Sequence, residues 1–156
     1  MIRLVMKQLL RHHVHVKKMT REPTLHTPNT GAPRPLVPGE ELVRLFSAQM
    51  HLLLEGDESQ VETVLTAVAP NLPRPVTTWS GTQSLATVRD GTLIVRLVDR
   101  FDAEQQRQLL RWLEETAGRV RVIATTPGSL FRLVQRGIFL DVLYYRLNTL
   151  RVDITT

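Results

Sequence analysis

The sequence predicts an α/β fold built on a doubly wound parallel sheet, and three observations predict it. Short apolar runs of strand length alternate with amphipathic helical patterns over about 115 residues. One of these runs, residues 92–98, is almost continuously apolar, as in a strand that is covered on both faces. The composition, 42% hydrophobic and 22% charged, is that of an ordinary globular domain.

Residues 1–38 form an N-terminal arm that is separate in composition from the α/β domain predicted for residues 39–156. The arm holds seven Lys or Arg residues against one Glu, whereas the remainder holds 13 basic and 14 acidic residues. Its five prolines predict an extended linker, because proline lacks a backbone donor and blocks helix formation. Residues 1–11 are predicted to form a short amphipathic helix whose apolar face consists of Ile2, Val5, Met6, Leu9 and Leu10.

The first half of the domain contains two predicted helices and two predicted strands. The segment 59–68 has apolar residues on one helical face, and Ser59 is the expected N-cap. In chain order the elements are a helix over 40–49, a strand over 51–55 that ends at Gly56, the helix over 59–68 and a strand over 76–79.

The second half begins with the apolar strand over residues 92–98. Asp102 and Gln105 have the spacing of a capping box and open a long helix. Gly137 is the expected end of a later helix. The remaining elements are a strand over 119–125, helices over 129–136 and through 143–147, and a last strand over 150–154.

Several classes of protein are disfavoured by the sequence. The chain has no cysteine, which excludes disulfides, thiolate metal sites and cysteine nucleophiles and fits a reducing cytoplasm. No apolar run reaches the roughly 20 residues that span a bilayer, and the start of the chain lacks a secretory cleavage pattern. No nucleophile motif such as G-x-S-x-G is present, so hydrolase chemistry has no support.

The most specific segment is LYYRLN at residues 143–148, which follows the strand sequence RVIATT at 121–126. Together they resemble the AAA+ (sigma-54 interaction) domain of bacterial sigma-54-dependent transcription activators, in which a strand VRVIAATN precedes the signature LYYRLN. GTLIV at 91–95 is similar to the family's GTLFLDEI. The likeness spans residues 40–154 and is strongest after Asp90. It implies a three-layer parallel sheet of the P-loop NTPase/AAA+ type, reduced in size and without the helical lid.

The P-loop of this family, G-x-x-x-x-G-K-[ST], aligns with residues 56–63. A working loop needs glycines that let backbone N–H groups approach phosphate, a lysine for the β and γ phosphates, and a hydroxyl for Mg²⁺. Gly56 and Thr63 match the pattern, but Val61 replaces the second glycine and Glu62 replaces the lysine. A carboxylate at that position repels phosphate, so nucleotide binding in the usual mode is not expected.

The other catalytic positions of the family are also replaced. Arg96 and Leu97 stand where the aspartate and glutamate of GTLFLDEI hold Mg²⁺ and prepare the attacking water. The nearest rival acidic residue is Asp99, which lies three positions after Arg96. Pro127 aligns with the sensor asparagine, and of the two arginines near the last helix only Arg146 remains. The resemblance therefore implies a pseudo-ATPase with no catalytic residue and no cofactor.

Parts that the family uses for other contacts are shortened or absent in the alignment. Only 29 residues separate Thr63 from Leu93, too few for the loop by which the family contacts the sigma factor. The alignment also stops before the helical lid and the helix-turn-helix that usually follow in the family.

The leading hypothesis is therefore a non-catalytic protein-interaction or scaffold module, regulatory or structural in a larger assembly. Its expected partners are proteins, among them a second copy or an intact AAA+ relative, bound through the arm's apolar face and Arg146. One alternative is a nucleic-acid-associated transcription regulator that uses the basic arm; a remote one is a residual ATP-binding protein. A membrane surface is disfavoured, because one basic apolar helix without aromatic residues is a poor anchor. His12, His13 and His15 have no carboxylate or cysteine partner nearby, so no metal site is expected.

Overall fold

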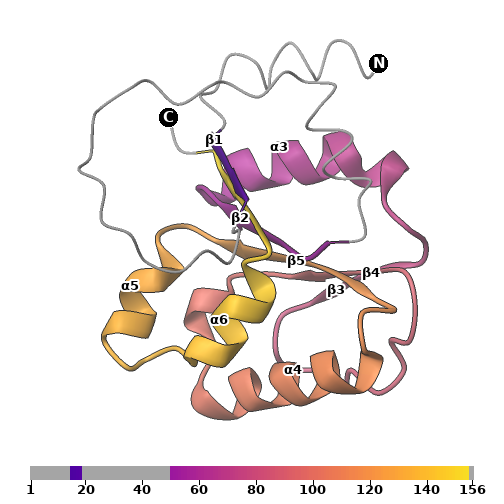
Figure 1. Ribbon diagram of the computed structural model, residues 1–156. Helices are drawn as coiled ribbons and strands as arrows, with labels where there is room; N and C mark the ends of the chain where they lie inside the picture. Colours follow the sequence, from indigo (N-terminus) through magenta and orange to yellow (C-terminus); the bar gives the residue numbers. More distant parts are fainter. Residues whose placement is uncertain (1–14, 19–49, 155–156) are drawn as a thin grey trace.

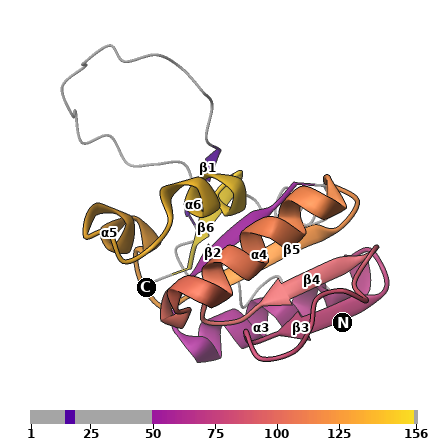
Figure 2. The same cartoon turned by 90° about the horizontal axis from the view of Figure 1, so that it is seen from below.

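The computed structural model describes residues 50–154 and, as backbone alone, residues 15–18. These residues form a three-layer domain around a six-stranded sheet with the order β1-β6-β2-β5-β4-β3. Figure 1 shows α3 on one face of the sheet and α4, α5 and α6 on the other. Figure 2 shows the second helical layer from below, with α4 lying over the sheet and α5 and α6 beside it.

The strands are β1 (His15–Lys18), β2 (Leu52–Glu55), β3 (Val76–Trp79), β4 (Thr92–Val95), β5 (Arg121–Thr126) and β6 (Leu150–Asp153). The helices are α3 (Glu58–Val68), α4 (Ala103–Thr116), α5 (Leu130–Gln135) and α6 (Asp141–Leu147), with short 3-10 turns at Ala69–Asn71 and Val98–Arg100. Strands β2 to β6 pair only in parallel with one another, which confirms the predicted parallel sheet.

The central strands are buried on both faces, so alternate residues of one strand enter two different cores. Leu53 of β2 packs with α4 and α6, whereas Leu52 and Leu54 pack under α3. The core beneath α4 is the larger and contains Trp112 and Leu143. This burial explains why the strands lack the polar alternation of a half-exposed sheet.

Two boundaries differ from the sequence predictions for physical reasons. The N-cap of α3 is Asp57 and not Ser59, because the Asp57 carboxylate accepts the Gln60 N–H in a capping box. Strand β4 ends at Val95, and Val98 is buried in a 3-10 turn that follows it. The capping box of Asp102 and Gln105 on α4 is confirmed.

Strand β1 was not predicted, since residues 13–18 carry no distinct pattern. It pairs antiparallel with β6, with His15 opposite Asp153 and Lys18 opposite Leu150. Part of the arm therefore adds a sixth strand to one edge of the parallel sheet. The helices predicted over residues 1–11 and 40–49, and the boundary at residue 38, lie outside the described residues.

Within the described part of the chain, the structure contains no helix of the length and apolar character that a bilayer span requires.

Candidate functional site

The residues aligned with the family's catalytic motifs meet at the carboxyl ends of the strands, where parallel α/β sheets bind their ligands. Glu55, the last residue of β2, lies opposite Thr126, the last residue of β5. Val95, at the end of β4, lies opposite Ala124 of β5. The segments 56–63, 96–99 and 126–127 are therefore neighbours in space, as the alignment requires.

The connection between β2 and α3 is only two residues long, Gly56 and Asp57. Helix α3 begins at Glu58, so most of the segment aligned with the P-loop is helical. Four of the six backbone amides from 56 to 61 donate hydrogen bonds within the chain. They are Gly56 to Thr126 O (3.0 Å), Asp57 to Gln60 Oε1 (3.2 Å), Gln60 to Asp57 Oδ1 (3.0 Å) and Val61 to Asp57 O (2.9 Å).

The side chain of Ile154, the residue after β6, also closes this loop. A Cβ placed on Gly56 would lie 2.3 Å from Ile154 Cγ1, and Ile154 is 2% exposed. The Ile154 N–H donates to Glu55 O at 2.8 Å, which fixes this contact. The loop is therefore packed against an apolar side chain of the domain.

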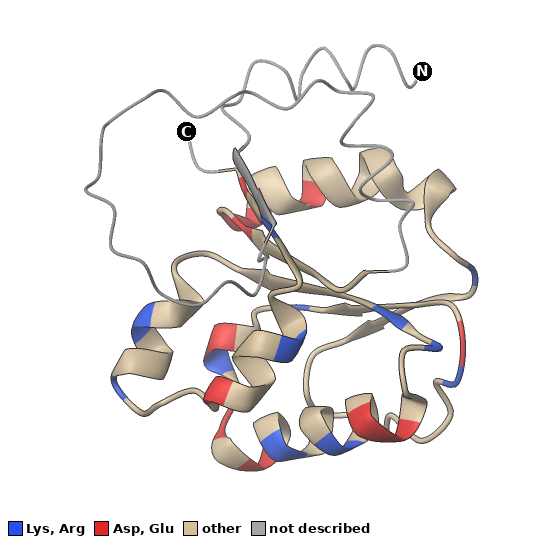
Figure 3. Ribbon diagram, viewed as in Figure 1, with Lys and Arg blue, Asp and Glu red and all other residues tan. Residues whose placement is uncertain are grey.

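The lysine and aspartate positions of the family are joined here by an ion pair of reversed polarity. Arg96 Nη1 lies 2.7 Å from Glu62 Oε2, and Arg96 Nη2 lies 3.4 Å from Glu58 Oε1. Figure 3 shows the acidic residues of α3 in red along the helix. The glutamates are about two-thirds exposed, so the pair contributes at most about 1 kcal/mol to folding. The pair is important because it joins the lysine and aspartate positions of the family.

The residue after Arg96 has an uncommon backbone conformation. Leu97 adopts φ 49° and ψ 49°, in the left-handed region, and its N–H donates to Thr125 Oγ1 at 3.1 Å. Asp99, the rival acidic residue, lies in the 3-10 turn beyond it, and burial raises the pKa of its carboxyl group. Pro127 follows β5 directly, and the Thr126 hydroxyl donates to Gly128 O at 2.9 Å.

A buried ion pair at this edge was not found by the sequence analysis. Glu55 is 3% exposed and is bonded to Arg151 of β6, whose guanidinium also lies 3.8 Å from Asp153 Oδ2. Burial raises the pKa of Glu55, and the Arg151 charge and hydrogen bond oppose that rise. The sequence shows only that Glu55 is a charged residue at the end of an apolar run. It does not show that Glu55 pairs with Arg151, which is almost a hundred positions away.

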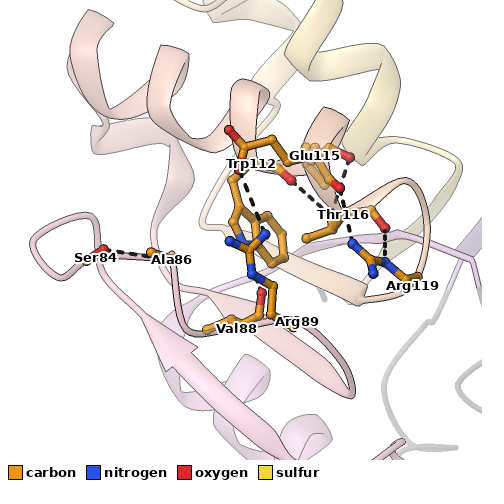
Figure 4. Close-up of polar contacts among 9 residues, drawn as sticks. Ser84, Ala86, Val88, Arg89, Trp112, Glu115, Thr116 and Arg119 are labelled. Atoms are coloured by element: carbon orange, nitrogen blue, oxygen red, sulfur yellow. Dashed lines mark hydrogen bonds and ion pairs between the residues drawn. The ribbon is translucent and has the colours of Figure 1, made fainter.

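The connection between β3 and β4, where the family carries its longer insertion, is packed onto α4 (Figure 4). Trp112 of α4 donates its indole N–H to Val88 O at 3.1 Å, and Leu85 and Val88 are buried. Arg89 lies 3.9 Å from Glu115 of the same helix. The shortened connection is thus part of the core beneath α4.

Arg146, the retained family arginine, lies on α6 and donates to Glu114 of α4 at 3.3 Å. It borders a cavity of about 520 Å³ at the opposite end of the sheet from the P-loop remnant, also lined by His51 and Thr149. Burial and then the charges of Arg121 and Arg146 lower the pKa of His51, whose Nδ1 accepts the Val122 N–H. Among the described residues, Arg146 lies away from the segment 56–63, which is the P-loop remnant.

Among the described residues, the exposed large hydrophobic side chains all lie on α5, α6 and the turn between them. We call this group the α5–α6 patch: Phe131, Ile138, Val142 and Tyr145, each 39–51% exposed. Tyr144 is buried beneath it, with its ring 5.6 Å from Phe131 and 5.3 Å from Tyr145. Over residues 50–154, no cluster of three or more His, Cys, Asp or Glu side chains is placed to hold a metal ion.

A parallel α/β sheet with this strand order, whose strand ends carry a P-loop remnant, defines a reduced P-loop domain of the AAA+ type. The chain belongs to the sigma-54 interaction domain family, whose model matches residues 47–156. It is 33% identical over 75 residues to the HTH-type transcriptional regulatory protein TyrR of Salmonella typhimurium, and 35% identical to TyrR of Enterobacter agglomerans. These alignments cover 41% of this chain but only 15% and 14% of those regulators.

Solved structures share the fold. NtrX from Brucella abortus in complex with ATP superposes with a TM-score of 0.60 at 18% identity, over 74% of this chain and 34% of NtrX. The P-loop NTPase domain of a sigma-54 activator from E. coli superposes with a TM-score of 0.51 at 16% identity, over 68% of this chain and 98% of that domain. The predicted reduced AAA+ sheet is confirmed.

Proposed function

We propose that this chain is a non-catalytic interaction module of the sigma-54 activator type, which keeps the AAA+ sheet and binds protein through it. The observation that carries the proposal is the Arg96–Glu62 ion pair. It joins the two positions that hold phosphate and Mg²⁺ in an active relative, with their charges exchanged. Because the side chains of Arg96 and Glu62 neutralise each other, neither is free to hold a phosphate or Mg²⁺.

The loop supports the same conclusion independently of the ion pair. A phosphate-binding loop presents free backbone N–H groups to its ligand. Here most of those donors are bonded within the chain, and the Asp57 carboxylate caps α3 at the place where phosphate would sit. The residues present therefore do not fit a bound nucleoside triphosphate with Mg²⁺.

Isothermal calorimetry tests the absence of a nucleotide site. We expect no saturable binding of Mg-ATP with a Kd below about 10 μM, either by the natural chain or by the double variant Glu62→Lys/Arg96→Asp. The double variant restores the family's charges but not its loop, so it separates the two arguments. One-to-one binding by the natural chain refutes the proposal. Binding by the double variant alone means that charge and not loop geometry closes the site.

The binding surface we propose is the α5–α6 patch together with Arg146, and the partner is an intact AAA+ relative. Val142 and Tyr145 are three residues apart on α6 and thus share a face with about half of each side chain exposed. A patch of this kind on an otherwise polar surface marks an interaction site. The arm's apolar face, Ile2, Val5, Met6, Leu9 and Leu10, is proposed as a second contact with the assembly.

A titration against a purified intact relative from the same host tests this surface. We expect the chain to lower the ATPase rate of the relative, because it occupies a neighbouring position without contributing a working site. Val142→Asp should raise the half-maximal concentration about tenfold or more, since a charge in an apolar contact costs at least 1.4 kcal/mol. Thr66→Asp, an exposed position on α3, is the matched control. Equal potency of both variants contradicts the assignment of the patch.

A further inference from the structure

Among the residues that the structure describes, the outer edge of β6 is paired with β1, a strand of four residues from the arm. An uncovered strand edge presents a row of unpaired N–H and C=O groups that can pair with another chain. The identity of the strand that covers this edge therefore affects whether the domain associates with other molecules.

The β6 sequence is complementary to itself in one antiparallel register. When Val152 is placed opposite Val152 of a second copy, Arg151 falls opposite Asp153 and Leu150 falls opposite Ile154. Both charged positions then meet an opposite charge, and both apolar positions meet an apolar residue. Directly opposite residues lie on the same face of an antiparallel pair, where opposite charges stabilise and like charges destabilise pairing.

The side chains of this edge already point to the faces that such a pairing needs. Leu150, Val152 and Ile154 are buried in the core under α3, at 1%, 1% and 2% exposure. Arg151 and Asp153 alternate with them and are each 29% exposed. A second β6 would therefore extend the apolar layer on one face and the charged row on the other.

The pairing with β1 is less complementary than this. Its register sets His15 opposite Asp153 and Val16 opposite Val152, but it also sets Lys17 opposite Arg151, two basic positions, and Lys18 opposite Leu150. The advantage of β1 is its attachment to the same chain. A tether of some 30 residues, from Lys18 to Leu52, gives it an effective concentration on the order of millimolar at most.

We propose that the β6 edge is a dimerisation surface for a second copy of this chain, which pairs antiparallel about Val152, and that β1 competes with it for that edge. The two copies would form one continuous sheet about a twofold axis, an isologous contact in which each subunit uses the same residues. The inference depends on β6 and β1 alone and not on the state of the nucleotide site.

Proline substitutions in β1 of the full chain test the competition. Only every second N–H of an edge strand faces its neighbour, so just one of Val16→Pro and Lys17→Pro removes a ladder bond, and the other is the matched control. We expect light scattering to show one of these variants shifting from the 17.8 kDa of a single chain towards twice that mass. Its dimerisation midpoint should be about tenfold lower than that of the other variant. Adding Asp153→Lys should reverse the shift, since it sets two cations opposite each other.

A cysteine at the twofold axis locates the contact. The chain has no natural cysteine, so Val152→Cys introduces a single thiol. Paired residues in antiparallel strands have Cα atoms about 4.5–5.5 Å apart, within disulfide range. We expect Val152→Cys in the dimerising variant to form a cross-linked dimer, and Thr66→Cys on α3 to form none. Proline variants that are folded and monomeric at about 100 μM, or equal cross-linking at both positions, overturn the proposal.

Discussion

Gly91→Ala is expected to destabilise the domain by more than about 4 kcal/mol. A Cβ at this position would lie 2.1 Å from Pro75 O and 2.6 Å from Pro75 N, so it would meet backbone that cannot rotate away. The Gly91 carbonyl accepts the Arg121 N–H, and the neighbouring Thr92 N–H donates to Pro75 O. Moving the chain at Gly91 therefore disturbs the pairing of β4 with both neighbouring strands.

Gly118→Ala is the matched control, because the two glycines share a backbone conformation but differ in the room available for an added Cβ atom. Their φ angles are +78° and +77°, but nothing lies within 4 Å of a Cβ built on Gly118. That substitution should cost only the strain of a left-handed alanine, about 1–2 kcal/mol. Urea unfolding of both variants measures the difference. Equal losses of stability would show that the contact with Pro75 relaxes at little cost.

The sequence predicted the parts of the fold that depend on local chemistry. The bounds of β3 and the capping box of α4 were predicted correctly, since a strand that begins directly after a proline and a paired Asp and Gln are signals contained in a few residues. The parallel sheet followed from the alternation of apolar runs and amphipathic segments. The predicted extent of β4 was wrong. Val98 is apolar because it is buried in a 3-10 turn, and nothing in the apolar run marks where the strand ends.

The candidate site was predictable as a set of replaced residues but not as a set of contacts. Alignment with the family showed that Glu62 and Arg96 had exchanged charges. It did not show that they meet, since 34 positions separate them and each is by itself an ordinary surface residue. Strand β1 was missed for a related reason: its pairing with β6 uses backbone groups that every residue carries, so four residues leave no pattern.

Arg151→Met is expected to destabilise the domain by about 3 kcal/mol at pH 7, because it leaves the buried Glu55 carboxylate without its partner. Burial already holds the pKa of Glu55 above its ordinary value, and loss of the Arg151 charge removes the main opposing effect. A carboxyl group whose pKa is raised by folding stabilises the folded state below its unfolded pKa, roughly 4.3, and loses that contribution as the pH rises through the folded pKa.

The difference in stability between Arg151→Met and the natural chain should therefore shrink as the pH falls from 7 towards about 4.5. Asp153 also lies near Arg151, at 3.8 Å from its guanidinium. The double variant Glu55→Gln/Arg151→Met shows whether Glu55 causes the effect, since a neutral amide at residue 55 should remove most of the dependence of stability on pH. Urea unfolding at several pH values measures this. If the single variant loses the same stability at pH 4.5 and pH 7, the guanidinium acts through packing and not through its charge.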